Sequence, residues 1–215
     1  WQGIEPGIKA AKLGHPVVMT PKLFTYLDYT QGDHTIEQPI YSDLSLKTAY
    51  DFEPVPDGVN SELILGGQGN LWTEQIPTIR HAFYMTYPRA FALSEVYWSS
   101  KEKKDWNSFV NRTEQHFQRF NAYETPVSKA IYDPIVKTKK DGDKFIIMIT
   151  SDLPNTEVYY TIDNTFPDNF TPKYTAPITI PEGNVTLKAI TYRNGRPVGR
   201  MLSIPLKELK ERAGK

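Results

Sequence analysis

The sequence predicts an α/β region followed by a small all-β region. Two apolar stretches, residues 16–20 and 63–71, have the composition of strands and alternate with helical patterns. Such an order is typical of a parallel sheet that is buried on both faces. After Asp133-Pro134 the pattern changes to short strands separated by turn signals, which predicts an antiparallel β-sandwich of immunoglobulin-like size.

The first strand is expected between a helix and a long loop. Residues 3–13 place apolar side chains on one side of a short amphipathic helix, and Gly14 is suited to end it. Residues 20–56, which follow the strand, are rich in Tyr, Asp and Pro and predict a mostly irregular loop. Loops of this length in compact domains are usually functional.

Two further helices are expected after the second strand. Residues 78–98 form a helical pattern that Pro88 breaks or kinks, because proline removes a backbone donor and clashes with the preceding turn. Ser99 and Glu102 have the spacing of a capping box for the next helix. The apolar face of that helix consists of Trp106, Phe109, Val110, Phe117 and Phe120.

In the all-β region, turn signals such as Asp141-Gly142 and Asn194-Gly195 separate the expected strands. These strands are residues 145–149, 158–162, 178–180 and 185–192. We therefore expect a first domain at residues 1–133, a sandwich at 134–208 and a charged, solvated tail at 209–215.

Composition excludes several classes of function. The 215 residues carry 25 basic and 25 acidic side chains and no cysteine, which argues against a broad nucleic-acid or membrane surface and excludes disulfides and thiolate sites. No apolar run is long enough to span a bilayer. Because the chain begins at Trp1 inside an apparent strand end, we expect it to be a piece of a longer polypeptide.

Both strand ends of the first region carry an aromatic residue and an acid. Tyr26 and Asp28 follow the first strand, and Trp72 and Glu74 follow the second. Aromatic faces stack on the C–H side of a pyranose and carboxylates accept hydrogen bonds from its hydroxyls, so this pairing predicts a sugar pocket. Taken singly, each aromatic residue also fits a core position and each acid a solvated one, and Trp1 alone is uninterpretable.

Other polar groups indicate structure rather than chemistry. Arg89 and Glu95 lie six positions apart at the expected Pro88 kink and favour an ion pair or a hydrogen-bond anchor over catalysis. No histidine has a partner at metal-ligand spacing, so neither a zinc site nor any other cofactor is expected. The cluster from Asp163 to Asn169 fits no calcium loop and is typical of Asx-rich turns.

Several segments together resemble the family-twenty glycoside hydrolases, the β-N-acetylhexosaminidases. In order, they are WQGIEPGI at the start of the chain, GHPVVMTP, YLDY, ILGGQGNLWTE and YPRAFALSEVYWS. The resemblance runs from Trp1 to about Tyr123. The later region, with VYYTID and YTAPI, is similar to the small β-sandwich that follows the barrel in bacterial hexosaminidases and chitobiases.

The resemblance implies the last third of a (β/α)8 TIM barrel and an exo-acting, retaining glycosidase. In that family the 2-acetamido oxygen of the substrate attacks the anomeric carbon, and an adjacent Asp-Glu pair after the fourth barrel strand does the carboxylate work. That pair is not among these residues. The chain therefore cannot be a complete active site, and no metal is implied.

The resemblance also assigns roles to five residues. Tyr26 matches the tyrosine that donates to the acetamido oxygen, and Asp28 an acid that binds a sugar hydroxyl at the far rim. Glu74 matches the acid that binds the hydroxyls at positions four and six. Trp72 matches the tryptophan on the pocket floor, and Trp1 one that lines the acetamide methyl pocket.

The expected partners are an N-acetylhexosamine-terminated glycan and the rest of the barrel, with neither nucleic acid nor membrane. A partial barrel has open sheet edges, which the missing strands or a homo-oligomer would cover. The resemblance implies a periplasmic, cell-surface or secreted bacterial protein. Two alternatives stay open: a non-catalytic carbohydrate-binding protein with a decayed barrel, and a purely structural fragment.

Overall fold

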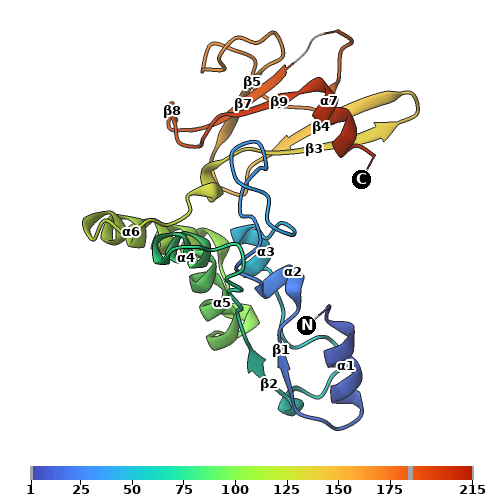
Figure 1. Cartoon of the computed structure of the whole chain (residues 1–215), viewed down its shortest axis with the longest axis vertical. Coiled ribbons are helices and arrows are strands. Elements are labelled where there is room, and N and C mark those ends of the chain that lie inside the picture. The colour runs from blue at the N-terminus through green and yellow to red at the C-terminus, as the bar shows by residue number, and fades with distance from the viewer. Residues whose placement is uncertain (1, 184–185, 215) are drawn as a thin grey trace. The chain divides into compact units, whose positions relative to one another are not determined.

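A computed structural model describes residues 2–183 and 186–214, which form two compact units (Figure 1). The first unit comprises the chain up to Gln31 and the segment Gln38–Ser128. The second comprises Gly32–Glu37 and the chain from Lys129 onward. The short segment Gly32–Glu37 therefore belongs to the second unit, although its neighbours on both sides belong to the first.

The first unit contains a two-stranded parallel sheet. Strand β1 (Val17–Met19) pairs with β2 (Ile64–Gly67) over the register Val17↔Ile64 to Met19↔Gly67. Helix α1 (Glu5–Lys12) precedes β1 and ends before Gly14, whose φ of +85° suits glycine. The predicted helix, its glycine cap and the parallel pairing are confirmed.

Within the described chain, this sheet is only partly covered, as an incomplete barrel would leave it. Val18 is 49% exposed and Leu65 is 68% exposed. Both are apolar strand residues, and the described chain covers each of them only in part. The sheet therefore presents apolar side chains of the kind that a neighbouring layer would bury.

The loop between the two strands is more ordered than predicted. It contains the short helices α2 (Lys22–Thr25) and α3 (Leu46–Tyr50) and ends in the 3-10 turn η1 (Ser61–Leu63). Ser45 caps α3 by accepting a hydrogen bond from the Thr48 backbone at 3.1 Å. Helices this short contain too few turns to show an amphipathic period, so the pattern alone does not reveal them.

Helices α4 (Ile79–Thr86) and α5 (Arg89–Trp98) confirm the predicted break at Pro88. Glycines let α5 come close to the end of β2. A side chain at Gly67 would meet the ring of Tyr97 at 2.2 Å, and one at Gly69 would meet Leu93 at 2.9 Å. The small residues after β2 therefore allow the close approach that packs α5 beneath the strand end.

The last helix of this unit is α6 (Trp106–Ala122), which buries Phe109, Val110 and Phe117. The predicted capping box is wrong: the 3-10 turn η2 (Lys101–Lys103) intervenes, and the Asp105 side chain caps the helix by accepting from the Ser108 backbone at 2.6 Å. Among the described residues, no helix combines the length and apolar character that crossing a membrane requires.

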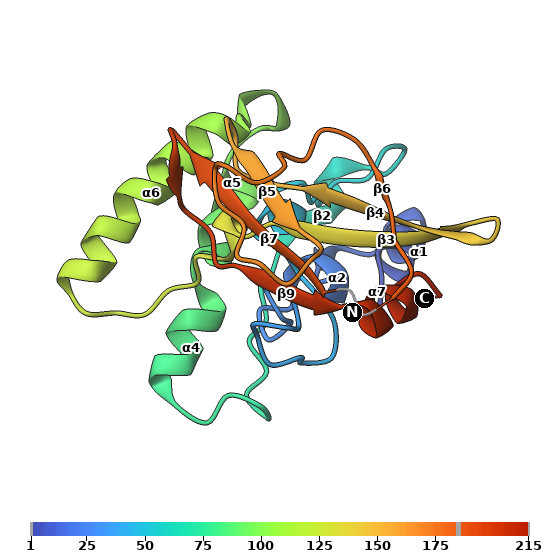
Figure 2. The ribbon, with the colours of Figure 1, turned by 90° about the horizontal axis from the view of Figure 1, so that it is seen from above.

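The second unit contains two antiparallel sheets, seen from above in Figure 2. One has the order β3-β4-β6, and in the other β7 lies between β5 on one side and β8 and β9 on the other. The strands are β3 (Ile135–Asp141), β4 (Lys144–Thr150), β5 (Glu157–Thr161), β6 (Ile178–Thr179), β7 (Thr186–Arg193), β8 (Arg196–Pro197) and β9 (Leu202–Pro205). The 3-10 turn η3 (Ala130–Tyr132) precedes them.

One apolar core joins the two sheets. Ile147 from β4, Leu187 from β7 and Ile204 from β9 are all fully buried in it. The structure confirms strands at each of the four predicted places, although residues 184–185 lie outside the described residues. Strands β3, β8 and β9 were not predicted, because β3 is mostly Lys, Thr and Asp, β8 is two residues long and β9 is four residues long.

The expected solvated tail is instead mostly a helix. Helix α7 (Leu206–Arg212) buries Leu209 completely in the core of the second unit. Arg212 donates to both carboxylate oxygens of Asp33, at 2.6 and 2.8 Å. Leu209 and Arg212 therefore hold this segment on the unit, while the side chains of Lys207 and Glu211 stay exposed to solvent.

Replacing Leu209 with alanine should test this packing. The change removes buried methyl groups and is expected to destabilise the second unit by about 2–5 kcal/mol. Hydrogen exchange of the β3 and β9 amides, which α7 contacts, measures the loss. Lys207→Ala is the matched control, because its side chain is 89% exposed. Equal protection in both variants would contradict the assigned packing.

Candidate functional site

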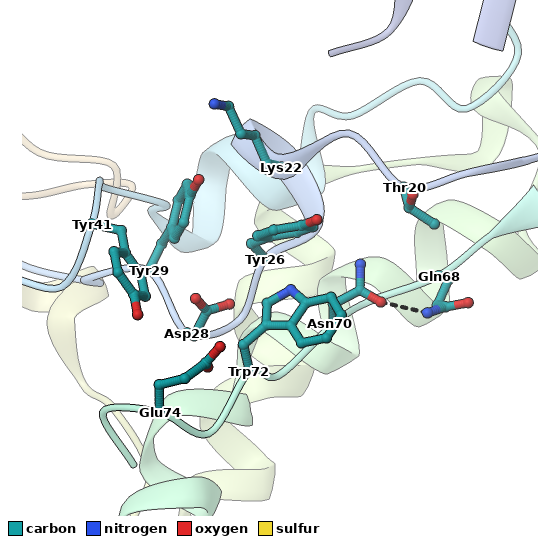
Figure 3. A pocket seen from close by; sticks show the side chains of 10 residues that line it. All are labelled: Thr20, Lys22, Tyr26, Asp28, Tyr29, Tyr41, Gln68, Asn70, Trp72 and Glu74. Atoms are coloured by element: carbon teal, nitrogen blue, oxygen red, sulfur yellow. Dashed lines mark hydrogen bonds between the residues drawn. The ribbon is translucent and has the colours of Figure 1, made fainter. Parts of the chain in front are cut away.

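A pocket of about 760 Å³ lies in the first unit where the two strands end (Figure 3). Its lining is largely aromatic and polar. The residues that line it are Thr20, Lys22, Tyr26, Asp28, Tyr29, Tyr41, Gln68, Asn70, Trp72 and Glu74. Four of the five predicted site residues are thus brought together, while Trp1 lies outside the described residues.

Backbone pairing beyond the strands brings the two ends together. Tyr26 and Asn70 form an isolated parallel bridge. The Leu27 N–H donates to the Asn70 carbonyl at 2.6 Å, and the Asn70 N–H donates to the Thr25 carbonyl at 2.9 Å. The chain after α2 therefore runs beside the chain after β2, which sets Tyr26 and Asp28 next to Trp72 and Glu74.

The aromatic part of the site consists of Tyr26, Tyr29 and Trp72. The Tyr26 and Trp72 rings have centroids 6.0 Å apart at 60°, and Tyr29 meets Tyr26 edge-on at 5.7 Å. Trp72 is 48% exposed, so one part of its indole remains open to a ligand. An indole face of this kind can stack on the apolar face of a sugar ring.

The acidic part of the site combines a buried and an exposed carboxylate. Asp28 is 1% exposed, and its Oδ1 has no hydrogen-bond partner among the described residues. Glu74 is exposed, and its carboxylate lies beside that of Asp28 on one side of Trp72 (Figure 3). A buried carboxylate oxygen without a partner is costly, and here it lines a pocket in which a hydroxyl can donate to it.

Burial raises the pKa of Asp28 above its ordinary value, and the neighbouring charge of Glu74 adds to the rise. The backbone N–H groups of Asp28 and Trp72 and the charge of Arg89 act in the opposite direction and do not cancel it. Asp28 therefore takes up a proton at a higher pH than an exposed aspartate. Below that pH it can no longer act as an acceptor-only carboxylate.

Arg89 is fully buried at the start of α5. Its guanidinium donates to the backbone carbonyls of Leu27, Tyr29, Leu44 and Met85 at 2.6–3.0 Å. The expected hydrogen-bond anchor is confirmed. Glu95, the alternative partner for an ion pair, instead bonds Arg112 and accepts from the Tyr50 hydroxyl at 2.9 Å.

Sequence reasoning missed six of the lining residues. Gln68 and Asn70 stand between the second strand and Trp72, and their side chains bond each other (Figure 3). Tyr41 has a φ of +53°, which is uncommon for a tyrosine, and it is 67% exposed at the pocket. Its place within the long loop was the only available signal, because left-handed backbone cannot be read from a tyrosine in the sequence.

The site does not include a candidate metal centre. Within residues 2–183 and 186–214, no group of three His, Asp or Glu side chains could hold a metal ion. What the arrangement offers is stacking on an indole, a phenol donor and two carboxylate acceptors. These are the groups that recognise a polyhydroxylated ring.

Two family models match the chain. Residues 1–101 match the catalytic domain of glycosyl hydrolase family 20, and residues 147–203 match the model described as Fn3 associated. The first match covers β1, β2 and all the pocket residues. The second lies within the all-β unit.

Two curated relatives are named as hexosaminidases. A "Beta-hexosaminidase" of Porphyromonas gingivalis is 31% identical over 204 residues, covering 89% of this chain and 26% of that protein. A "Beta-N-acetylhexosaminidase" of Cellulomonas fimi is 34% identical over 116 residues, covering 52% of this chain and 23% of that protein. The chain thus spans about a quarter of the length of these relatives.

Solved structures agree with the sequence comparisons. A GH20 exo-β-N-acetylglucosaminidase from Vibrio harveyi, solved in complex with N-acetylglucosamine, has a TM-score of 0.55 and 32% identity over 60% of this chain and 21% of that one. A GH20 β-N-acetylhexosaminidase from Streptomyces coelicolor has a TM-score of 0.52 at 23% identity, covering 57% and 25%, and supports the fold alone. Residues 1–101 of this chain therefore belong to the catalytic domain of glycosyl hydrolase family 20, a TIM-barrel family.

Proposed function

We propose that the whole protein containing this chain is an exo-acting, retaining β-N-acetylhexosaminidase. It would remove terminal N-acetylglucosamine or N-acetylgalactosamine from glycans or chitooligosaccharides. One observation carries the proposal: Tyr26 and Trp72 form an aromatic wall beside the paired acids Asp28 and Glu74, inside the part of the chain that matches the family. The catalytic Asp-Glu pair is expected upstream of Trp1.

Each side chain has a chemical task in this proposal. The Tyr26 hydroxyl donates to the acetamido oxygen of the substrate and so aims that internal nucleophile at the anomeric carbon. Trp72 stacks on the sugar ring. Asp28 and Glu74 accept from ring hydroxyls, which holds the terminal sugar in one orientation.

The all-β unit has a scaffolding role in this proposal. We assign residues 134–208 to a sandwich of immunoglobulin-like size, which two antiparallel sheets over one core support. Val18 and Leu65 are exposed on the sheet of the first unit, and the upstream barrel strands, or a second copy, would cover them. A periplasmic, cell-surface or secreted bacterial location completes the proposal.

The test compares two substrates on the polypeptide extended upstream of Trp1. An aryl N-acetyl-β-glucosaminide carries the acetamido group, and the matching aryl β-glucoside lacks it. Because the acetamido oxygen is the proposed nucleophile, we expect cleavage of the first substrate only.

Cleavage of both substrates would show that the acetamido group does not take part and would contradict the mechanism. Cleavage of neither would contradict the enzymatic proposal. In that case, binding of free N-acetylglucosamine would favour a carbohydrate-binding protein, and absence of binding would favour a structural role.

A further inference from the structure

The buried guanidinium of Arg89 binds the backbone next to Asp28, one of the acids of the pocket. Arg89 Nη2 donates to the carbonyls of Leu27 and Met85, both at 2.6 Å. Arg89 Nη1 donates to the carbonyls of Tyr29 at 2.8 Å and Leu44 at 3.0 Å. One side chain therefore connects the start of α5 to two parts of the long loop, the segment Leu27–Tyr29 and Leu44.

One Arg89 bond and one backbone bond hold the two peptide groups that flank Asp28. The peptide group before Asp28 is held through the Leu27 carbonyl, which accepts from Arg89. The peptide group after it is held through the Tyr29 N–H, which donates to the Tyr26 carbonyl at 3.2 Å. With both flanking peptide groups bound, the φ and ψ of Asp28 are set, and only its side-chain torsions remain adjustable.

The result is a carboxylate held in a cavity wall with an oxygen that has no partner. Asp28 is 1% exposed, yet its Oδ1 makes no hydrogen bond within the described part of the chain. Burial raises the pKa of Asp28, and the nearby positive charge of Arg89 opposes part of that rise. Arg89 thus acts on Asp28 mainly through the backbone and also through its charge.

We propose that Arg89 is a positioning residue of the sugar site, which fixes Asp28 as a hydroxyl acceptor by binding the backbone carbonyls of Leu27 and Tyr29. The proposal rests on the proposed function, because it assigns Asp28 to sugar binding. It extends that function to a residue that does not itself line the pocket.

The first test replaces Arg89 with lysine in the whole protein. Lysine keeps the charge, but its single ammonium cannot reproduce a planar fork that reaches four carbonyls. We expect the dissociation constant of N-acetylglucosamine and KM to rise about tenfold or more, with a smaller change in kcat, because a hydrogen bond to a charged group is misaligned. Arg119→Lys is the matched control, since Arg119 is exposed on α6.

A double-mutant cycle separates positioning from general stability. If Arg89 acts through Asp28, Arg89→Lys should weaken binding by less than about twofold once Asp28→Asn is present. The same tenfold loss in both backgrounds would overturn the proposal, and so would unchanged affinity of Arg89→Lys itself.

A second variant leaves Arg89 intact, in case its replacement prevents folding. Asp28→Glu keeps the charge and adds one methylene. If the backbone is held as proposed, the longer side chain cannot be accommodated, and affinity should fall about tenfold or more, close to the loss for Asp28→Asn. Affinity within about threefold of the unmodified protein would show an adjustable segment and overturn the proposal.

Binding of N-acetylglucosamine to the unmodified protein distinguishes failure of the proposed function from failure of the role of Arg89. If the unmodified protein neither binds this sugar nor cleaves the aryl substrate, the proposed function has failed and the role of Arg89 falls with it. If the unmodified protein binds and the Arg89 and Asp28→Glu variants bind equally well, only the role of Arg89 has failed.

Discussion

Replacing Tyr26 with phenylalanine in the whole protein is expected to lower kcat by about 10²-fold or more. Removing a single donor of the oxyanion-hole type has an effect of about this size, because the donor is already placed where charge develops in the transition state. Tyr26 lies in the pocket at 6.0 Å, centroid to centroid, from Trp72. Loss of its hydroxyl should leave this aromatic wall in place and remove only the donor.

Single-turnover measurement of the chemical step on the aryl N-acetyl-β-glucosaminide checks this expectation. Tyr123→Phe serves as the control, because Tyr123 is 82% exposed at the end of α6. A loss under threefold for Tyr26→Phe would refute the role of the phenol in aiming the acetamido oxygen.

Replacing Glu74 with glutamine should act on binding rather than on chemistry. The amide keeps the shape of the side chain but removes the charge that strengthens its hydrogen bonds to sugar hydroxyls. A hydrogen bond to a charged group contributes about 1.5–3 kcal/mol, so KM is expected to rise about tenfold or more with kcat little changed. The loss should shrink on a substrate that lacks the hydroxyls at positions four and six.

The matched control is Glu62→Gln, an exposed glutamate in the turn before β2. It has the same chemistry and lies outside the pocket lining. A Glu74→Gln variant with unchanged KM and a large fall in kcat would contradict the assignment, because the interaction would then be made only in the transition state.

Local patterns were sufficient for much of the fold. Pro88 divides α4 from α5 because proline cannot continue a helix, and Gly14 follows α1 because glycine readily adopts a positive φ. The apolar face of α6 and four of the strands in the all-β region follow from residue spacing and type in the same way. These elements are set by residues that are close together in the chain.

One expectation that proved wrong concerns contacts between distant residues. The composition of the charged C-terminal segment predicts a solvated tail, yet Leu209 packs into the core of the second unit and Arg212 bonds Asp33, 179 positions earlier. The other concerns a choice between two local caps: the chain first forms a 3-10 turn, and Asp105 rather than Ser99 caps α6.

The acids and aromatic residues that follow two strands identified four of the ten pocket residues without coordinates: Tyr26, Asp28, Trp72 and Glu74. The motifs that contain these residues also indicated the family. Their interactions, in contrast, depend on the tertiary structure. Asp28 is buried, and Arg89 binds the carbonyls of Leu27 and Tyr29, which lie about 60 positions earlier in the chain. Residue types follow directly from the sequence, whereas desolvation and hydrogen-bond partners depend on which distant segments fold together.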